Sequence, residues 1–324
     1  MRFFSSSAVK NVEYPDNRQT AQVNLCPKTF FIHQIPCFVI FCKKRSERVD
    51  YMEKIIFLGG DRRMLHAAEA LGNKYSCTVY SPDNTDYDAK NSAAYDYAVL
   101  PLKKSTDGIT IPDTYISYSA LGRIVKEGGT VFTGNVCPEL ERVCYGKGIA
   151  LVNYLEREEL AIANAVPTAE GALEIAINRM PVTIFGCKAL VTGYGRIAKI
   201  LAKYLNAMGA HVLIACRRKS DMKWAEVGGC TTVDITDKNA FAAALSEAEV
   251  IFNTVPHRVI EKDAVKENVL YIELASIDGI DPEAKAEIIT ARGLPGKIAP
   301  VTAGRIIAET IETILAERSD NSDT

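Results

Sequence analysis

The sequence lacks long apolar runs and an excess of charge of either sign. Among its 324 residues, 38 Lys and Arg stand against 40 Asp and Glu, which gives a net charge of −2. A protein that neutralises nucleic-acid phosphates over a broad surface needs an excess of basic residues, so we expect no nucleic-acid partner. No stretch offers the roughly 18 uninterrupted apolar residues of a transmembrane helix, so we expect no membrane partner either. The length and the 48% of hydrophobic residues are typical of a two-domain globular protein.

The sequence also lacks the residue spacings that bind metals or build a disulfide framework. Its nine cysteines contain no CxxC pair, and its four histidines contain no HxxxH pair. An odd number of scattered cysteines is typical of reduced thiols in a cytoplasmic protein. We therefore expect no metal site, no disulfides and a cytoplasmic location.

The first 51 residues differ in composition from those that follow. They contain a polar stretch and then an apolar run from Phe30 to Phe41, which is too short to span a bilayer. Met52 stands just before the first clear strand. We expect residues 1–51 to be a non-native or disordered leader and Met52 to be the natural start. A genuine but poorly ordered arm is the alternative.

From Lys54 onwards, short apolar runs alternate with segments of helical periodicity, a pattern that predicts parallel sheets covered by helices. In the first half the expected strands cover residues 55–60, 77–80, 97–101, 130–134 and 149–154, and the expected helices cover 62–73, 117–127 and 138–145. In the second half the expected strands cover residues 188–193, 211–216, 231–234, 250–255 and 269–275. The second series makes a complete mononucleotide-binding unit.

Two further helices belong to neither series and are expected to bridge two lobes. One covers about residues 157–178, with a break at Pro167 left open, and the other runs from Thr302 to about Ala316. The predicted fold is α/β, with two Rossmann-like parallel-sheet lobes, a cleft between them and a C-terminal helix that returns to the first lobe. The expected domains are a substrate lobe over 52–156 joined by helix 303–317, an NAD(P)-binding lobe over 157–302 and a disordered tail over 318–324.

The strongest local motif lies between the strands expected at 188–193 and 211–216. Gly193 permits a tight turn, Gly195 lets a pyrophosphate approach the backbone, and Ala198 keeps the following helix close to the sheet. A glycine turn without a ligand is the alternative. The residues expected to bind a dinucleotide here are Thr192, Gly193, Tyr194, Gly195, Arg196 and Ile197.

The end of the next strand favours one type of cofactor. An NAD site usually carries Asp or Glu at this place to bind the ribose hydroxyls, whereas this chain has Cys216, Arg217 and Arg218. A lysine follows them. Clustered cations suit a 2′-phosphate, so we predict NADP as the cofactor. NAD, or a basic loop that is merely solvated, is the alternative.

Two more strand ends fit the same lobe. Short side chains after the fourth strand are expected to line the cofactor's ribose, and backbone groups after the fifth are expected to hold the nicotinamide amide. Taken alone, each is also an ordinary strand end. The residues concerned are Asn253, Thr254, Val255, Pro256, Ala275 and Ser276.

A set of motifs in a fixed order points to a known family. These motifs are GGDR (59–62), EREELAIANAVPTAEG (156–171), GYGR (193–196), ACRR (215–218), NTVP (253–256), LAS (274–276) and LPGKIAPVTAG (294–304). With them, the chain from about Glu53 to Ala316 resembles the dehydrogenase-like subunit of dipicolinate synthase from spore-forming bacteria. One departure is that the resemblance implies an Arg-Pro-Gly-Gly-like loop after Ser276, where this chain has Ile277 and Asp278. The role of that arginine towards a substrate carboxylate is therefore in question.

The resemblance implies an activity and partners. Members of this family oxidise dihydrodipicolinate, or its hydroxy-tetrahydro precursor from the lysine pathway, to pyridine-2,6-dicarboxylate during sporulation, with a nicotinamide cofactor as hydride acceptor. The resemblance also implies a second, flavoprotein-like dipicolinate synthase subunit as partner, and a place in the cytoplasm of the mother cell. We further expect a homo-oligomer. Because aromatisation drives the loss of the ring proton, the protein chiefly has to orient the ring and bind two carboxylates.

A small dicarboxylate substrate needs convergent hydrogen-bond donors, which we expect at the carboxyl ends of the strands. The turn at 59–62 offers backbone N–H groups and an arginine, although a plain turn with solvated arginines is the alternative. Glu170 and His66 are the candidates for proton exchange, against the plainer interpretations of a helix-start carboxylate and a surface histidine. The expected substrate-binding residues are Gly60, Asp61, Arg62, Thr133, Gly134, Asn164 and Thr168.

Other functions stay open, among them an S-adenosylhomocysteine-hydrolase-like or alanine-dehydrogenase-like enzyme, although both usually carry a different substrate lobe. A D-2-hydroxy acid dehydrogenase shares the two-lobe plan, but it needs a late histidine to deprotonate the hydroxyl, and no histidine follows His257. A non-catalytic, nucleotide-sensing subunit is the alternative from another class. Reduction of NADP with the aromatising substrate, without turnover of 2-hydroxy acids, would separate these functions.

Overall fold

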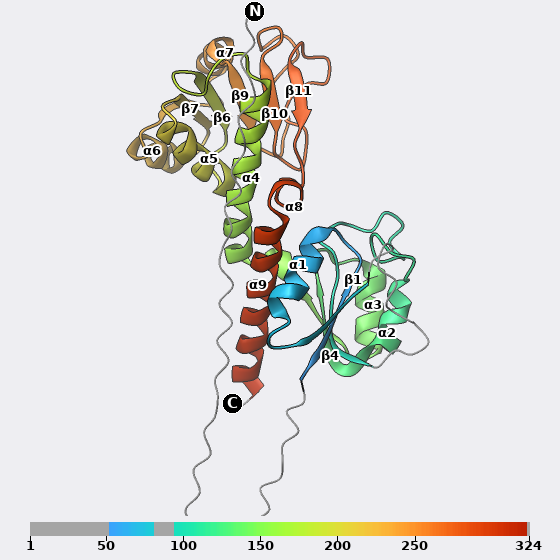
Figure 1. Cartoon of the computed structure of the whole chain (residues 1–324). Coiled ribbons are helices and arrows are strands. Elements are labelled where there is room, and N and C mark those ends of the chain that lie inside the picture. Colours follow the sequence, from blue (N-terminus) through green and yellow to red (C-terminus); the bar gives the residue numbers. More distant parts are fainter. Residues whose placement is uncertain (1–51, 81–93, 323–324) are drawn as a thin grey trace, which may run out of the picture. The chain divides into compact units, whose positions relative to one another are not determined.

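The computed structural model describes residues 52–80 and 94–322 of the chain. The leader expected over residues 1–51 and the last two residues of the expected tail lie outside this range. Two parallel sheets with flanking helices make up the described part (Figure 1), which confirms the predicted fold class.

The first sheet has five parallel strands in the order β2-β1-β3-β4-β5. These strands are β1 (Lys54–Leu58), β2 (Ser76–Tyr80), β3 (Tyr95–Val99), β4 (Val125–Thr133) and β5 (Ala150–Asn153). The helical segments between them are α1 (Arg62–Leu71), η1 (Tyr118–Ala120), α2 (Leu121–Ile124) and α3 (Pro138–Gly146), and η2 (Tyr154–Glu156) follows β5. Successive side chains of a strand point to opposite faces, so Ile55 and Phe57 pack in one apolar cluster while Ile56 and Leu58 pack in another.

The helix expected over 117–127 is shorter than predicted. Its last residues belong to β4, where Lys126 Nζ lies 2.7 Å from Asp96 Oδ1 of the segment that forms β3. The pairing of β3 with β4 shifts register between Tyr95 and Tyr97, and the extra length of β4 contains Gly128 at φ +77°. A bulge of this kind is hard to recognise in a sequence because it interrupts the apolar alternation.

The second sheet has six parallel strands in the order β11-β10-β9-β6-β7-β8. They are β6 (Lys188–Thr192), β7 (His211–Cys216), β8 (Thr231–Asp234), β9 (Val250–Asn253), β10 (Leu270–Glu273) and β11 (Glu287–Thr290). The helices that follow or separate them are α5 (Arg196–Ala207), α6 (Lys219–Val227), α7 (Lys238–Glu247) and α8 (Leu294–Ile298). The sequence did not indicate β11, because this short edge strand is mostly exposed and carries no buried apolar run.

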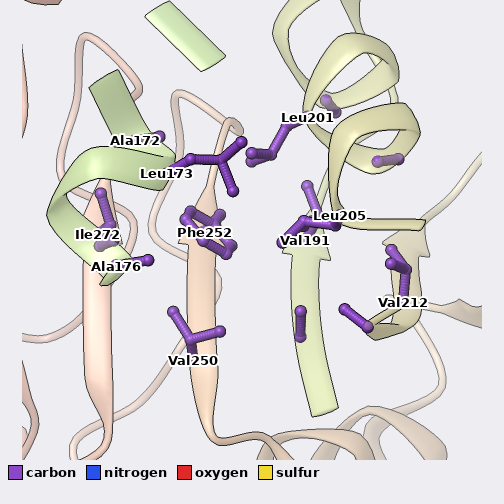
Figure 2. Close-up of a cluster of buried hydrophobic side chains, with 14 of the residues drawn as sticks. Ala172, Leu173, Ala176, Val191, Leu201, Leu205, Val212, Val250, Phe252 and Ile272 are labelled. Carbon is purple, nitrogen blue, oxygen red and sulfur yellow. The ribbon is translucent and has the colours of Figure 1, made fainter. Parts of the chain in front are cut away.

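The core of the second lobe lies under α4 (Glu158–Arg179) and α5. Figure 2 shows Ala172, Leu173 and Ala176 of α4 facing the strands beside Leu201 and Leu205 of α5. The strands contribute the buried residues Val191, Val212, Val250, Phe252 and Ile272. Because both helices pack on the same face of the sheet, α4 reaches the carboxyl end of β6, where the cofactor motif begins.

Helix α4 runs for 22 residues without a break at Pro167. Proline removes one backbone hydrogen bond, and packing of the helix against α5, α8 and α9 outweighs that loss. The Thr168 hydroxyl donates to the carbonyl of Asn164 at 2.7 Å, one turn earlier. By length and hydropathy α4 would also suit a membrane span, but 44% of its most apolar window is buried inside the protein. That burial is typical of a core helix.

The C-terminal helix α9 (Pro300–Ser322) packs against α1 of the first lobe (Figure 1). Ile307, Ile311 and Ile314 lie in the same apolar cluster as Met64 and Leu71 of α1. The helix extends beyond the expected end at residue 317, so the prediction of a disordered tail from 318 was wrong for residues 318–322. No glycine or proline stops the helix there.

Candidate functional site

The turn after β6 requires glycine at its first position. Gly193 has φ +84°, and a Cβ placed there would lie 2.7 Å from the Thr254 hydroxyl oxygen and 3.1 Å from Val255 Cγ2. Its N–H donates to the carbonyl of Ala215 in β7 at 2.8 Å. The tight turn inferred from the sequence is therefore present, and it brings the end of β6 against the loop after β9.

The N-terminus of α5 is open to a ligand. Gly195 caps the helix without a side-chain hydrogen bond, and the first turn contains no acidic residue. A Cβ on Gly195 would meet nothing within 4 Å. The free N–H groups and the positive end of the helix dipole fit the pyrophosphate of a dinucleotide. The residues at this helix N-terminus therefore fit the dinucleotide that the glycine motif implies.

A cavity of about 680 Å³ adjoins this turn. Its lining includes the predicted cofactor residues Gly193, Tyr194, Gly195, Cys216, Arg217, Arg218, Val255 and Pro256. Burial raises the pKa of the Cys216 thiol, so this cysteine lines the cavity in its neutral form. The glycine turn at 193–195 and the basic strand end at 216–218 therefore line the same cavity.

The basic residues after β7 are not equally available to a phosphate. Arg218 Nε donates to Asp221 Oδ2 at 2.7 Å, and Lys219 Nζ donates to Asp234 Oδ2 at 2.9 Å. Arg217 is exposed and, within residues 52–80 and 94–322, forms no ion pair. Of these three cations, Arg217 is therefore the one left available to an anionic ligand.

Asp221 lines the same cavity and was missed in the sequence analysis. Its side chain is 16% exposed and lies in the first turn of α6. A carboxylate here can accept hydrogen bonds from ribose hydroxyls, as the acid at the strand end does in NAD sites. The signal that was available is an acidic residue in the first turn of the helix that follows this strand.

A second cavity of about 300 Å³ lies on the other side of the α5 N-terminus. It brings Asn164 and Thr168 of α4 together with Gly195, Arg196, Ile197 and Thr254, all of them predicted site residues. The side-chain oxygen of Asn164 is buried and has no hydrogen-bond partner within the described part of the chain. Arg196 Nη1 lies 2.7 Å from Glu158 Oε2 at the start of α4.

Four other predicted cofactor residues line neither cavity. Thr192 and Asn253 are fully buried and bond to each other through their side chains, so they lie beneath the site. The Ala275 N–H donates to Glu273 and its carbonyl accepts from Arg292, so both backbone groups are already engaged. Ser276 is exposed.

In the first lobe, the turn at 59–62 is built around an ion pair. Asp61 caps α1 by accepting from the backbone N–H of Arg63. Arg63 Nε and Nη2 bond to the two carboxylate oxygens of Asp61, at 2.8 Å and 2.6 Å in the shorter contacts. Arg62 is exposed and forms no ion pair within the described residues. Gly60 has φ +86°, and a Cβ on it would clash with Met64.

The end of β4 lies close to the end of β3. A Cβ on Gly134 would lie 2.5 Å from Leu102 Cα. Thr133 is buried, and its hydroxyl donates to the carbonyl of Asn135 at 2.8 Å. Thr133 therefore uses its donor within its own turn.

The two candidates for proton exchange lie apart from both cavities. Glu170 is exposed on α4. His66 lies against α9, where a Cβ on Gly304 would be 2.6 Å from His66 Cβ. Its Nδ1 bonds Glu69 at 2.7 Å, and its Nε2 is buried without a hydrogen-bond partner in the described part of the chain.

Arg292 was also missed in the sequence analysis. It follows β11, yet its Nε donates to the Ala275 carbonyl at 3.1 Å and its Nη2 to Asp278 at 2.6 Å. The sequence carries no local signal for this contact, because it depends on the undetected strand β11.

Comparisons with known proteins agree with this geometry. A family model described as NADP oxidoreductase, coenzyme F420-dependent, matches residues 189–269. A dipicolinate synthase subunit of Bacillus subtilis (strain 168) is 30% identical over 291 residues, which cover 82% of this chain and 96% of that protein. The crystal structure of the corresponding dipicolinate synthase subunit from Bacillus halodurans superposes with a TM-score of 0.72 at 25% identity, over 82% of this chain and 98% of that one.

A more distant likeness concerns the fold alone. The transhydrogenase from Sinorhizobium meliloti superposes with a TM-score of 0.59 at 13% identity, over 81% of this chain and 93% of that one. The fold and the cofactor motif are those of nicotinamide-dependent oxidoreductases, and the identity to the B. subtilis protein extends over both sheets. The chain belongs to the family of this dipicolinate synthase subunit.

Proposed function

We propose that this protein oxidises dihydrodipicolinate, or its hydroxy-tetrahydro precursor, to pyridine-2,6-dicarboxylate, with NADP as the favoured hydride acceptor and NAD as the alternative. The observation that carries this proposal is the site around the α5 N-terminus, in a chain that is 30% identical to a dipicolinate synthase subunit. Sporulation in the cytoplasm of the mother cell is the proposed setting.

The proposed reaction does not require a strong catalytic acid or base. The dihydropyridine ring loses one hydride and one proton and becomes aromatic; the hydroxy-tetrahydro form first loses water. A nicotinamide nucleotide supplies the hydride acceptor when bound. Because aromatisation drives the release of the proton, the protein mainly has to hold the substrate ring in the orientation that hydride transfer requires. Asn164 and Thr168 line the cavity beside the α5 N-terminus and are proposed to orient the substrate.

Two carboxylates require cationic partners. Arg62 is exposed at the carboxyl end of the first sheet. Arg292, whose side chain is 46% exposed, lies at the carboxyl end of the second sheet. Arg292 reaches the loop where the resemblance implies an arginine and pairs there with Asp278. It is proposed to serve the same carboxylate through Nη1, which makes no hydrogen bond within the described residues. Charge-assisted pairs of this kind are the stronger hydrogen bonds of proteins.

The proposal includes a partner. The related proteins are each one subunit of dipicolinate synthase, which implies an enzyme of more than one kind of chain. A flavoprotein-like subunit is proposed to complete the enzyme. A homo-oligomer of this chain is proposed as well.

A coupled assay tests the proposed function. Purified protein is mixed with NADP and freshly generated substrate, with and without the flavoprotein-like subunit, and reduced nucleotide and pyridine-2,6-dicarboxylate are quantified. Formation of both products in equal amounts supports the proposal. Turnover of 2-hydroxy acids instead would favour the rival dehydrogenase, and nucleotide binding without any turnover would favour a sensing subunit.

A further inference from the structure

A carboxylate lies buried beneath the loops that follow β9 and β10. Glu273, the last residue of β10, is 1% exposed. Its Oε1 accepts from Asn253 Nδ2 at 2.7 Å and from the Ala275 N–H at 2.9 Å. Its Oε2 accepts from the Tyr271 hydroxyl at 2.8 Å and from the Gly279 N–H at 2.7 Å. Each oxygen thus has two donors, and none of these donors is a cation.

This carboxylate decides how the Asn253 amide is oriented. Only the NH₂ side of an amide can face a carboxylate that accepts, so the oxygen of Asn253 must turn the other way. There it accepts from the Thr192 hydroxyl and, at 3.2 Å, from the Val255 N–H. The Asn253 Nδ2 also donates to the Val255 carbonyl at 3.0 Å. Glu273 therefore fixes the start of the loop after β9 through Asn253.

The loop after β10 closes around the same group. The N–H groups of Ala275 and Gly279 both point to Glu273, so the loop 275–279 wraps its carboxylate. A Cβ on Gly279 would lie 2.2 Å from Asn253 Nδ2. The two loops are therefore locked to each other as well as to Glu273.

The hydrogen-bond network around Glu273 lies beneath the loops on one side of the dinucleotide site. The α5 N-terminus receives the pyrophosphate, and Cys216 with Arg217 marks the adenosine side of it. After β9, Val255 lines the first cavity together with Cys216 and Arg217, whereas Thr254 lines the second cavity, so the loop 254–256 borders both. The loop after β10 lies on the side of β6 away from β7, where the nicotinamide half lies in a sheet of this order.

We propose that Glu273 is a positioning residue for the nicotinamide half of the site, which it serves by holding the loops 254–256 and 275–279 without touching cofactor or substrate. This inference rests on the proposed function, since it assumes a nicotinamide nucleotide. Leaving a buried polar group without a hydrogen-bond partner costs free energy. A substitution of Glu273 is therefore expected to displace these two loops first.

The test uses one isosteric variant, one milder variant and a matched control. Glu273→Gln replaces one acceptor oxygen by an NH₂ group, which cannot accept from the backbone N–H of Ala275 or Gly279 that faces it. Tyr271→Phe removes a single donor and keeps the carboxylate. Glu249→Gln is the control, because Glu249 accepts from the Lys188 N–H at 2.8 Å at the amino end of the same sheet, whereas Glu273 lies at its carboxyl end.

The measurement compares NADP with its adenosine fragment 2′,5′-ADP by titration calorimetry on the full chain. Glu273→Gln is expected to weaken NADP binding by about tenfold while fragment binding stays within about twofold. Tyr271→Phe is expected to give a smaller loss of the same kind, roughly two- to fivefold. The control variant is expected to change neither affinity.

The outcomes separate this inference from the proposed function. Equal losses for NADP and the fragment, or no loss for either, in both site variants would overturn the positioning role. If Glu273→Gln does not fold, the contrast between NADP and the fragment in Tyr271→Phe decides. Failure of the unaltered chain to bind NADP, the fragment and NAD alike would overturn the proposed function itself.

Discussion

Arg292 Nη2 lies 2.6 Å from Asp278 Oδ1, although fourteen positions separate the two residues. The Nε atom of the same arginine donates to the carbonyl of Ala275. A guanidinium therefore reaches the loop after β10 from beyond β11, and it does so at the place where Ile277 stands instead of an arginine.

We predict that Arg292→Ala raises the KM for the dicarboxylate substrate by roughly ten- to a hundredfold, the loss expected for one charge-assisted pair. Because Arg292 also donates to the Ala275 carbonyl in the loop 275–279, the KM for NADP should rise as well, but by less than the KM for the substrate. Arg292→Lys keeps the charge without the planar fork and should recover part of the loss. Steady-state kinetics on the coupled enzyme gives both quantities.

Arg179→Ala serves as the control for this prediction. Arg179 Nη1 pairs with Glu287 Oε1 at 3.0 Å at the start of β11, away from the loop after β10. An unchanged KM in Arg292→Ala, or an equal rise in the control, would contradict a role for Arg292 at the substrate.

The cofactor preference is predicted to depend mainly on Arg217. Because Arg218 is held by Asp221, Arg217→Ala should weaken NADP by roughly ten- to a hundredfold and leave NAD within about twofold. Lys219→Ala, which removes a cation already paired with Asp234, should have little effect on either nucleotide. Dissociation constants at one salt concentration check this. Equal losses for both nucleotides in Arg217→Ala would argue against a 2′-phosphate site.

Much of the fold was predictable because its signals are local. The strands at 211–216 and 231–234 have the predicted bounds, since each apolar run ends at a turn of polar residues. The strand at 287–290 gave no such signal, because an edge strand buries little of either face. The helix over 318–322 was missed because a polar segment without glycine or proline can still continue a helix that packing has already started.

The site was predictable in part for the same reason. The glycine turn at 193–195 and the basic strand end at 216–218 are contiguous motifs, and both line one cavity. Glu273, by contrast, is a charged residue in an otherwise apolar strand. Its role depends on a hydrogen bond from Asn253, twenty positions away in the sequence. Contacts between strand ends that are distant in sequence have no signature in a single chain.

Packing of α9 on α1 leads to a stability prediction. A Cβ on Gly304 would lie 2.7 Å from the Arg63 carbonyl oxygen and 2.6 Å from His66 Cβ, so Gly304→Ala should destabilise the protein by about 1–3 kcal/mol. Gly146→Ala in α3 is the control, because nothing lies within 4 Å of its Cβ position and the change should be neutral or stabilising. Urea denaturation measures both. A neutral Gly304→Ala would show that the two helices can separate without cost.

The Asp61–Arg63 pair leads to a pH dependence. The pKa of Asp61 lies below its usual range: partial burial raises it, and the hydrogen bonds and charge of Arg63 more than offset that effect. A lowered carboxyl pKa stabilises the fold above the unfolded pKa, and this contribution disappears as the pH falls through the folded pKa. Arg63→Ala should therefore lower the free energy of unfolding by about 0.5–1 kcal/mol at neutral pH. The difference from the unaltered chain should shrink as the pH falls below 3.8, the ordinary pKa of Asp, and vanish below the lowered pKa of the folded state. A difference that stays constant with pH would assign the loss to packing instead.

The last prediction concerns Arg62, the neighbour that this pairing leaves available. Since Arg63 is committed to Asp61, Arg62 is the arginine of the turn that can meet a substrate carboxylate. Arg62→Ala should raise the KM for the dicarboxylate by roughly ten- to a hundredfold and leave NADP affinity and the unfolding free energy unchanged. Arg123→Ala, an exposed arginine of α2 in the same lobe, is the matched control and should change none of the three. If Arg62→Ala keeps the KM of the unaltered chain, the turn at 59–62 is structural, and the carboxylates are held by Arg292 and the cavity at Asn164 and Thr168.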